Sequence, residues 1–438
     1  MLLPLARVCF ALFWMVILVS ARNHHHVTNH RSIKKPHNPT IYPGGEYKFL
    51  FGWNKLPKVE GARIDTSTFK LDDKGTFVTT YITENYDPKK IKRALIHIHG
   101  ISRDGWNQWM YSNEAGKMAA DHGGFSMDQV VIAAPVFFSN MDKGAYPVDE
   151  HGASSSRTII WDANNWGHAR DAILPVYDSG RLANPAYKSS MKRKLNGISR
   201  LESETLGPHR DVMDALDVYL EYFTDKSRFP NLEKVVVAGF SMGAQVVNRY
   251  TTLRPNKAED DRIIYWMASP GSYVYLNQMR PVHVSLNCTR FNSFKYGLEG
   301  HLPAYFHRKW INNTLSDIRD RYMTRKTVYL VGGADSSAED QSCMAKAQGK
   351  AHRDRMHEFV TKHIPSLPNN PTPGSIPKSV LYAQIEGIGH NAYRIMTSTA
   401  GMQSLYLEDF YGPGNHAAGP RVLRGGDSGM LSPDACLL

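Results

Sequence analysis

Long apolar runs are scarce in this sequence. The one clear example, Cys9–Val19, is too short to cross a bilayer comfortably. Arg7 precedes it and the small residues Val19-Ser20-Ala21 follow it, so residues 1–21 are predicted to be a secretory signal, with an uncleaved signal anchor as the alternative. Because no later stretch is apolar enough to span a membrane, we expect a secreted, extracellular protein without a stable membrane span.

Dense clusters of one charge are also lacking. The chain has 52 Lys and Arg against 41 Asp and Glu, a formal net charge of +11, but the basic residues are scattered apart from short groups such as Lys192-Arg193-Lys194. No motif of a nucleic-acid-binding module is visible. We therefore expect no nucleic-acid partner, and the charge is interpreted as favouring solubility and surface adhesion. A basic polymer-binding protein is an alternative that rests on the net charge alone.

Cysteine is rare, with four residues in 438. Cys9 would leave with the signal, and the three that remain can form one pair in an oxidising compartment. We favour Cys288–Cys343, because Cys436 lies in a weakly structured tail. Two sequons, at Asn287 and Asn312, predict glycosylation of a secreted protein.

Buried strands alternate with helical patterns over most of the chain. Near-continuous apolar runs are typical of parallel strands covered on both faces, and they occur at Ala94–Ile98, Val130–Pro135, Ile263–Ala268, Thr327–Val331 and Val380–Ile385. Helices are expected at about 109–121, 204–224 and 391–410. Shorter strand-like pieces, Tyr47–Phe51 and Phe77–Tyr81, predict an antiparallel meander ahead of the main sheet. The class is therefore α/β, with a mostly parallel central sheet and helices on both faces.

The remaining segments divide the chain as follows. Residues 22–45 are predicted to be a flexible N-terminal segment, 46–411 the α/β domain, and 412–438 a disordered tail. Two insertions interrupt the domain at about 136–203 and 269–325. The first is long enough to suggest a lid or a substrate wall, although a loop without a role explains it equally well.

The stretch Glu233–Tyr250 has the pattern of a strand, a tight turn and a helix. The β-branched run Val235–Val237 is followed by Gly239–Gly243, with the spacing Gly-x-Ser-x-Gly, and then by a helical pattern. This predicts a nucleophile elbow that exposes Ser241 at a helix N-terminus. A plain Gly/Ser loop after a buried strand is the alternative.

An acid and a base follow the serine in the order that this arrangement requires. Asp335 comes directly after the strand Thr327–Val331, and His390 follows the last strand, Val380–Ile385. Reactive groups in open parallel sheets lie beyond the carboxyl ends of strands. Ser241, Asp335 and His390 are therefore the predicted catalytic residues, with Asp340 as the reserve acid. Each also has an ordinary structural explanation, such as a turn or a helix cap.

The tetrahedral intermediate of such a reaction needs backbone donors for its oxyanion. The N–H of Met242 is one, and the loop after Ile98 should supply the other, with the N–H of Ile101 as first choice. This chemistry needs neither a cofactor nor a metal.

The chain resembles the α/β-hydrolase superfamily in His99-Gly100, Gly239–Gly243, Gly333–Asp335 and Gly389-His390, across roughly residues 91–410. It is also similar to uncharacterised secreted microbial hydrolase-like proteins that share the stretch His99–Asp104 and have a cysteine after the acid, as Cys343 is here. The resemblance implies a Ser–His–Asp hydrolase of the α/β-hydrolase fold, but it supplies no substrate. The loop departs from the HGGG run of many lipases and esterases, since one glycine follows His99; this weakens any transfer of their preference for bulky alcohol esters.

Two classes of function remain open at this point. The first is a secreted serine hydrolase that cleaves a small or polymeric ester or amide, as an esterase, lipase, peptidase or polymer hydrolase. The second is a non-catalytic binding protein on the same fold, since fold alone does not fix function. Four tryptophans, Trp106, Trp109, Trp161 and Trp166, are candidates either for a substrate pocket or for the core.

Overall fold

The computed structural model describes residues 40–45, 52–148, 157–175, 210–309, 314–407 and 421–422. The predicted signal, most of the N-terminal segment, Cys9, Cys436 and Asn312 lie outside the described residues, as do the predicted strand Tyr47–Phe51 and residues 204–209 of a predicted helix. The described residues from Ile41 onward belong to one structural unit.

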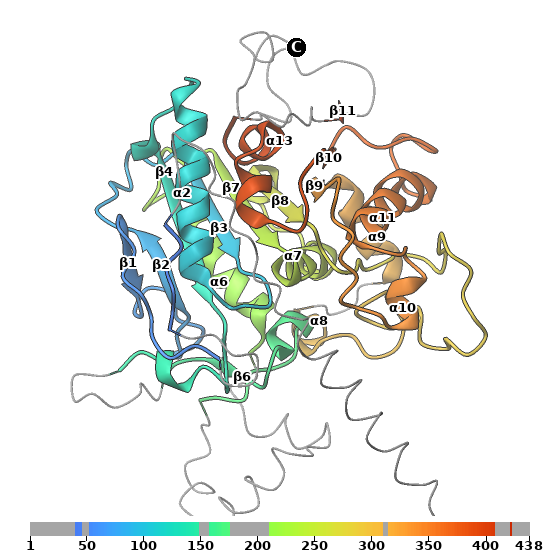
Figure 1. The fold of residues 1–438 in the computed structure, drawn as a ribbon, viewed down its shortest axis with the longest axis horizontal. Helices are drawn as coiled ribbons and strands as arrows, with labels where there is room; N and C mark the ends of the chain where they lie inside the picture. Colours follow the sequence, from blue (N-terminus) through green and yellow to red (C-terminus); the bar gives the residue numbers. More distant parts are fainter. Residues whose placement is uncertain are drawn as a thin grey trace, which may run out of the picture. The chain divides into compact units, whose positions relative to one another are not determined.

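One sheet organises the described part of the chain (Figure 1). Its strand order is β1 (Ala62–Asp65), β2 (Thr79–Thr83), β4 (Val130–Val136), β3 (Arg93–Ile98), β7 (Lys234–Phe240), β8 (Ile263–Ala268), β9 (Lys326–Gly332), β10 (Val380–Ile385) and β11 (Arg421–Val422). β2 pairs antiparallel with β1 and β4, whereas all pairs from β4 to β11 are parallel. The predicted α/β-hydrolase fold is confirmed by this mostly parallel sheet and by its helices on both faces.

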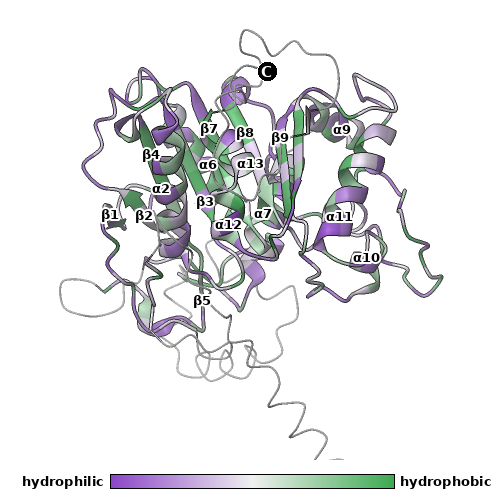
Figure 2. Ribbon diagram, turned by 45° about the horizontal axis from the view of Figure 1, so that its top comes forward, coloured by the Kyte–Doolittle hydropathy of each residue, from purple (hydrophilic) through white to green (hydrophobic). Residues whose placement is uncertain are grey.

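Each face of the sheet has its own apolar core. Val235 and Val237 of β7 face one core, and the alternate residues Val236 and Ala238 face the other; this is the period of two that a strand imposes. Helices α6 (Val212–Thr224), α7 (Met242–Leu253), α9 (Leu315–Thr324) and α11 (His352–Glu358) contribute to the first core. Helices α2 (Gly105–Asp121), α12 (Ala392–Met396) and α13 (Thr399–Met402) contribute to the second. The central strands are mainly hydrophobic along their length (Figure 2).

The last predicted helix is broken into pieces. After α12 the chain makes a turn at Thr397, and Ser398 caps the next helix by accepting a hydrogen bond from the Gly401 N–H at 3.1 Å. A π-helical turn, Gln403–Leu407, follows. A serine side chain that bonds to nearby backbone groups competes with helix continuation, which explains why one helix was expected and shorter ones are found.

The two interrupting segments differ in character. In the first, β5 (Phe138–Ser139) and β6 (Ile160–Trp161) form a small parallel pair. In the second, α8 (Ala304–Lys309) is followed by α9, which packs on α7 and leads directly into β9. The second segment therefore ends in a regular helix of the fold. No described helix is long and apolar enough to cross a membrane.

The predicted disulfide Cys288–Cys343 is present, with Cα atoms 5.9 Å apart. It ties the second interrupting segment to α10 (Cys343–Lys346), which follows the loop that carries Asp335. The bond closes a loop with a sequence separation of 55. Cross-links over loops of this length restrict the unfolded chain and typically stabilise a protein by about 2–4 kcal/mol.

We predict that replacing Cys288 and Cys343 together by serine lowers the unfolding temperature by several degrees, because the unfolded chain regains its freedom. Differential scanning calorimetry under non-reducing conditions measures this directly. Cys436→Ser is the matched control and should unfold at the wild-type temperature. Equal unfolding temperatures for the double variant and the wild type would contradict the stabilising role of the bond.

Candidate active site

Four loops that carry candidate residues leave the same edge of the sheet. The parallel strands β3, β7, β9 and β10 end at Ile98, Phe240, Gly332 and Ile385. Ile98 lies opposite Gly239 in the register of β3 and β7, and Ile385 lies opposite Gly332 in that of β9 and β10. The carboxyl ends of parallel strands meet at one edge, so the loops of His99, Ser241, Asp335 and His390 all start there.

Ser241 stands in a strained turn between β7 and α7. Its φ of 55° and ψ of −118° are unusual for a residue with a side chain. The turn is held by the Ser241 N–H, which donates to the Ala268 carbonyl at 2.9 Å. Although Ser241 occupies the N-cap position of α7, its side chain makes no capping hydrogen bond. The hydroxyl is therefore not used to cap the helix.

Both glycines of the Gly-x-Ser-x-Gly turn are required by close backbone approach. A Cβ at Gly243 would lie 2.4 Å from the Ile98 carbonyl oxygen and 2.5 Å from that of His99. A Cβ at Gly239 would lie 2.4 Å from the carbonyl carbon of Gly243. No side chain fits at these distances. Steric crowding of the backbone therefore explains the glycine at both positions of the pattern.

His390 and Asp335 form a hydrogen-bonded pair. His390 Nδ1 lies 2.8 Å from Asp335 Oδ2. The His390 ring also lies against Phe240, with ring centroids 4.6 Å apart, immediately before Ser241 in the chain. The reserve acid takes another role, because Asp340 accepts hydrogen bonds from the Tyr296 hydroxyl and the Ser342 N–H.

Only the histidine of this pair is accessible to solvent. The Asp335 side chain is fully buried, whereas the His390 side chain is 21% exposed. Burial raises the pKa of Asp335, but hydrogen bonds from His352 and His390 outweigh burial and hold the pKa well below its usual range. Asp335 is therefore a carboxylate at neutral pH and accepts a hydrogen bond from the Nδ1–H of His390. In the neutral form of that ring, Nε2 is then the acceptor.

The loop after β3 lies directly against the serine. A Cβ placed at Gly100 would come 3.4 Å from the Ser241 Cβ. His99 holds this loop: its Nε2 accepts the Phe137 N–H at 3.0 Å, so its proton is on Nδ1, which donates to the Gly100 carbonyl at 2.8 Å. Burial lowers the pKa of His99 to about 3, so the ring is neutral in this role.

A buried ion pair fixes the other side of the same loop. Arg103 donates to both carboxylate oxygens of Asp142, at 2.6 and 3.1 Å, and to the Ile101 carbonyl at 3.0 Å. Both charged side chains are fully buried. Because one fork of the guanidinium is anchored on Asp142, the Ile101 peptide is held in place. Arg103 was part of the motif noted in the sequence, but its partner Asp142 carried no local signal.

The sequence also gave no indication of a second histidine beside the pair. His352 Nδ1 lies 3.2 Å from His390 Nδ1 and 3.4 Å from Asp335 Oδ2. These three groups have the residue types of a metal site and lie within 4.8 Å of one another. The 2.8 Å between His390 and Asp335 is a hydrogen-bond distance, shorter than the ~3.3 Å between two ligands of a tetrahedral zinc ion. The geometry therefore favours hydrogen bonding within the cluster.

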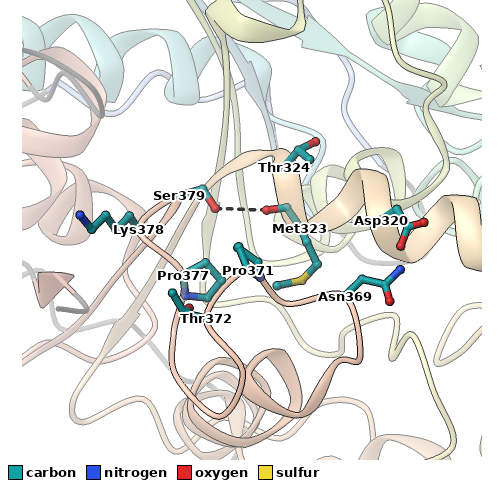
Figure 3. Close-up of a pocket in the computed structure, with 9 residues that line it drawn as sticks. All are labelled: Asp320, Met323, Thr324, Asn369, Pro371, Thr372, Pro377, Lys378 and Ser379. Atoms are coloured by element: carbon teal, nitrogen blue, oxygen red, sulfur yellow. Dashed lines mark hydrogen bonds between the residues drawn. The ribbon is translucent and has the colours of Figure 1, made fainter. Parts of the chain in front are cut away.

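The four candidate tryptophans lie in the cores and not in an open pocket. Each is at most 1% exposed. A cavity of about 530 Å³ is lined by Met323, Pro371 and Pro377, among other residues (Figure 3). It lies by Thr324 and Ser379, which precede β9 and β10, and therefore at the opposite edge of the sheet from His390.

No protein-family model matches this chain, and no curated protein matches it. Among solved structures, a poly(3-hydroxybutyrate) depolymerase from Bordetella parapertussis is 16% identical, with a TM-score of 0.46, covering 78% of this chain and 89% of that chain. A poly(aspartic acid) hydrolase from Sphingomonas sp. KT-1 is 16% identical, with a TM-score of 0.43, covering 78% and 95%. A siderophore hydrolase from Aspergillus nidulans is 12% identical, with a TM-score of 0.37, covering 80% and 94%. The fold assignment rests on the strand order and the turn at Ser241.

The glycines of the turn offer a direct test of this geometry. We predict that Gly243→Ala destabilises the protein by about 1–3 kcal/mol, because the methyl group meets the backbone carbonyls of Ile98 and His99. Gly389→Ala is the control, since the nearest atom to its Cβ would be 4.0 Å away. Thermal unfolding of the two variants gives the comparison. Similar unfolding temperatures for the Gly243→Ala and Gly389→Ala variants would contradict the close backbone contact at Gly243.

Proposed function

We propose that this protein is a serine hydrolase that cleaves an ester or amide bond through an acyl-enzyme. Ser241 is the nucleophile, His390 the general base and Asp335 the acid that orients it. The observation that carries the proposal is the 2.8 Å hydrogen bond between His390 Nδ1 and the buried Asp335. This hydrogen bond lies at the same edge of the sheet as Ser241, whose backbone is strained and whose hydroxyl makes no capping hydrogen bond.

The chemistry follows from the tautomer of His390. With its Nδ1–H donating a hydrogen bond to Asp335, the ring presents Nε2 to take the proton of the Ser241 hydroxyl as the oxygen attacks the substrate carbonyl. The imidazolium that forms is stabilised by the Asp335 carboxylate. It then gives its proton to the leaving alcohol or amine, and water repeats the sequence to release the acid.

The oxyanion would be held by two backbone donors. Met242 is the first residue of α7, and its N–H has no acceptor within the helix. Ile101 lies in the loop packed on Ser241, and among the described residues no acceptor is found for its N–H. His99 donates a hydrogen bond to the Gly100 carbonyl, and Arg103 donates one to the Ile101 carbonyl. The Gly100–Ile101 peptide, which carries the Ile101 N–H, is therefore fixed before substrate binds. Such preorganisation is the largest contribution to this type of catalysis.

The substrate is proposed only as a class, a small or polymeric ester or amide, with esterase or lipase activity as the first expectation. Secretion and glycosylation remain part of the proposal. The described disulfide is compatible with an oxidising compartment. Asn287 is exposed, which is compatible with its glycosylation.

We predict that Ser241→Ala and His390→Ala each reduce ester hydrolysis about a thousandfold or more, and that Asp335→Asn does the same, because it removes the charge that orients the base. The measurement is kcat/KM on a panel of p-nitrophenyl esters and peptide anilides. Asp340→Asn is the matched control and should retain activity within about tenfold, since Asp340 does not contact His390.

Two results would contradict the proposal. Turnover by wild-type protein that survives Ser241→Ala would place the chemistry elsewhere. No turnover of any substrate by folded wild type would favour a non-catalytic binding protein on this fold.

A further inference from the structure

A second histidine shares the acid of the proposed catalytic pair. His352 begins α11 and is 1% exposed. Its backbone N–H donates to the Ser337 carbonyl at 3.0 Å, which fixes it against the loop that carries Asp335. Its ring lies 4.7 Å from the His390 ring, centroid to centroid. The proposed mechanism gives this buried, titratable side chain no role.

Both nitrogens of His352 face carboxylates. Nε2 lies 2.9 Å from Glu339 Oε2, and Nδ1 lies 3.4 Å from Asp335 Oδ2. A neutral ring would direct a lone pair at one of these negative oxygens, whereas an imidazolium donates to both. Burial lowers the pKa of His352, but Asp335 and Glu339 outweigh burial and raise the pKa above its usual value. The contact with His352 in turn lowers the pKa of Glu339 to about 2.

Among the described residues, few other charges face the His352 ring. Asp335 and Glu339 come from the loop after β9, and His390 comes from the loop after β10. On α11 itself, Arg353 and Arg355 are directed to the carbonyls of Gly333 and Gly271, and Asp354 pairs with Arg353. On the side of α7, the neighbour of His352 is the uncharged Gln245; both side chains lie close to Gly271.

We propose that His352 is a positioning residue that is held as an imidazolium between Asp335 and Glu339 and keeps the resting His390 neutral. The inference rests on the proposed function. A fixed positive charge 3.2 Å from His390 Nδ1 opposes a second positive charge on that ring. Glu339 contributes the second carboxylate that allows both rings to be charged during the reaction.

The first test is the pH profile of kcat/KM. His352→Gln removes the charge and keeps a polar side chain, so the acid limb should move to higher pH by about one unit. His357→Gln is the matched control, because His357 is exposed on the same helix, and its profile should coincide with that of wild type. An unchanged limb in His352→Gln would overturn the proposal.

The second test does not depend on catalysis and is made in the Ser241→Ala background. A histidine whose pKa is higher in the folded than in the unfolded state stabilises the fold fully below the unfolded value of about 6.5. That contribution is lost as the pH rises through the folded pKa. The unfolding temperature of the parent should therefore exceed that of the His352→Gln variant most at about pH 6, and the difference should narrow toward about pH 9.

The outcomes separate the two proposals. A gap in unfolding temperature that does not change with pH would overturn the charged state of His352 whether or not the protein is a hydrolase. The metal content of the purified proteins is a third test. A stoichiometric transition metal that wild type retains on purification and His352→Gln loses would also overturn the inference, because the cluster would then be a metal site. If the wild type is inactive but the difference in unfolding temperature narrows toward about pH 9 as expected, only the hydrolase proposal is contradicted.

Discussion

The contact on which the site depends is between the first turn of α7 and the end of β3. Gly243 lies so close to the carbonyls of Ile98 and His99 that no side chain fits there. This approach forces the turn at Ser241 into its strained conformation and brings the Gly100 loop against the Ser241 Cβ. One backbone contact thus positions the proposed nucleophile and the candidate oxyanion donors together, and the parallel sheet holds both.

The rest of the site consists of polar anchors that each fix one group. His99 and Arg103 hold the carbonyls of the candidate oxyanion loop, and Arg103 is itself held by the buried Asp142. On the other side, Asp335 holds His390. Buried charges are costly unless they are paired, and here each is placed where it orients a peptide or a ring. A rigid support of this kind is what preorganised catalysis requires.

Much of this fold could be predicted because its signals are local. Apolar runs such as Val235–Val237 and the Gly-x-Ser-x-Gly spacing are written in consecutive residues, and so is the order of Ser241, Asp335 and His390. Asp335 was preferred from the sequence and Asp340 kept in reserve, because the position of each carboxylate depends on the path of a loop. Asp142, Glu339 and His352 were missed because each meets partners far along the chain or in irregular loops, with no motif spacing. The break at Ser398 was missed because a side-chain cap overrode the helical pattern.

The central claim is that Ser241 is an activated nucleophile. It is tested most directly by treating the folded protein with a fluorophosphonate and locating the adduct by peptide mass spectrometry. The account predicts one phosphonylated residue, Ser241, with labelling that falls sharply in His390→Ala because the base is lost. An adduct on another residue, or none on well-folded wild type, would contradict it.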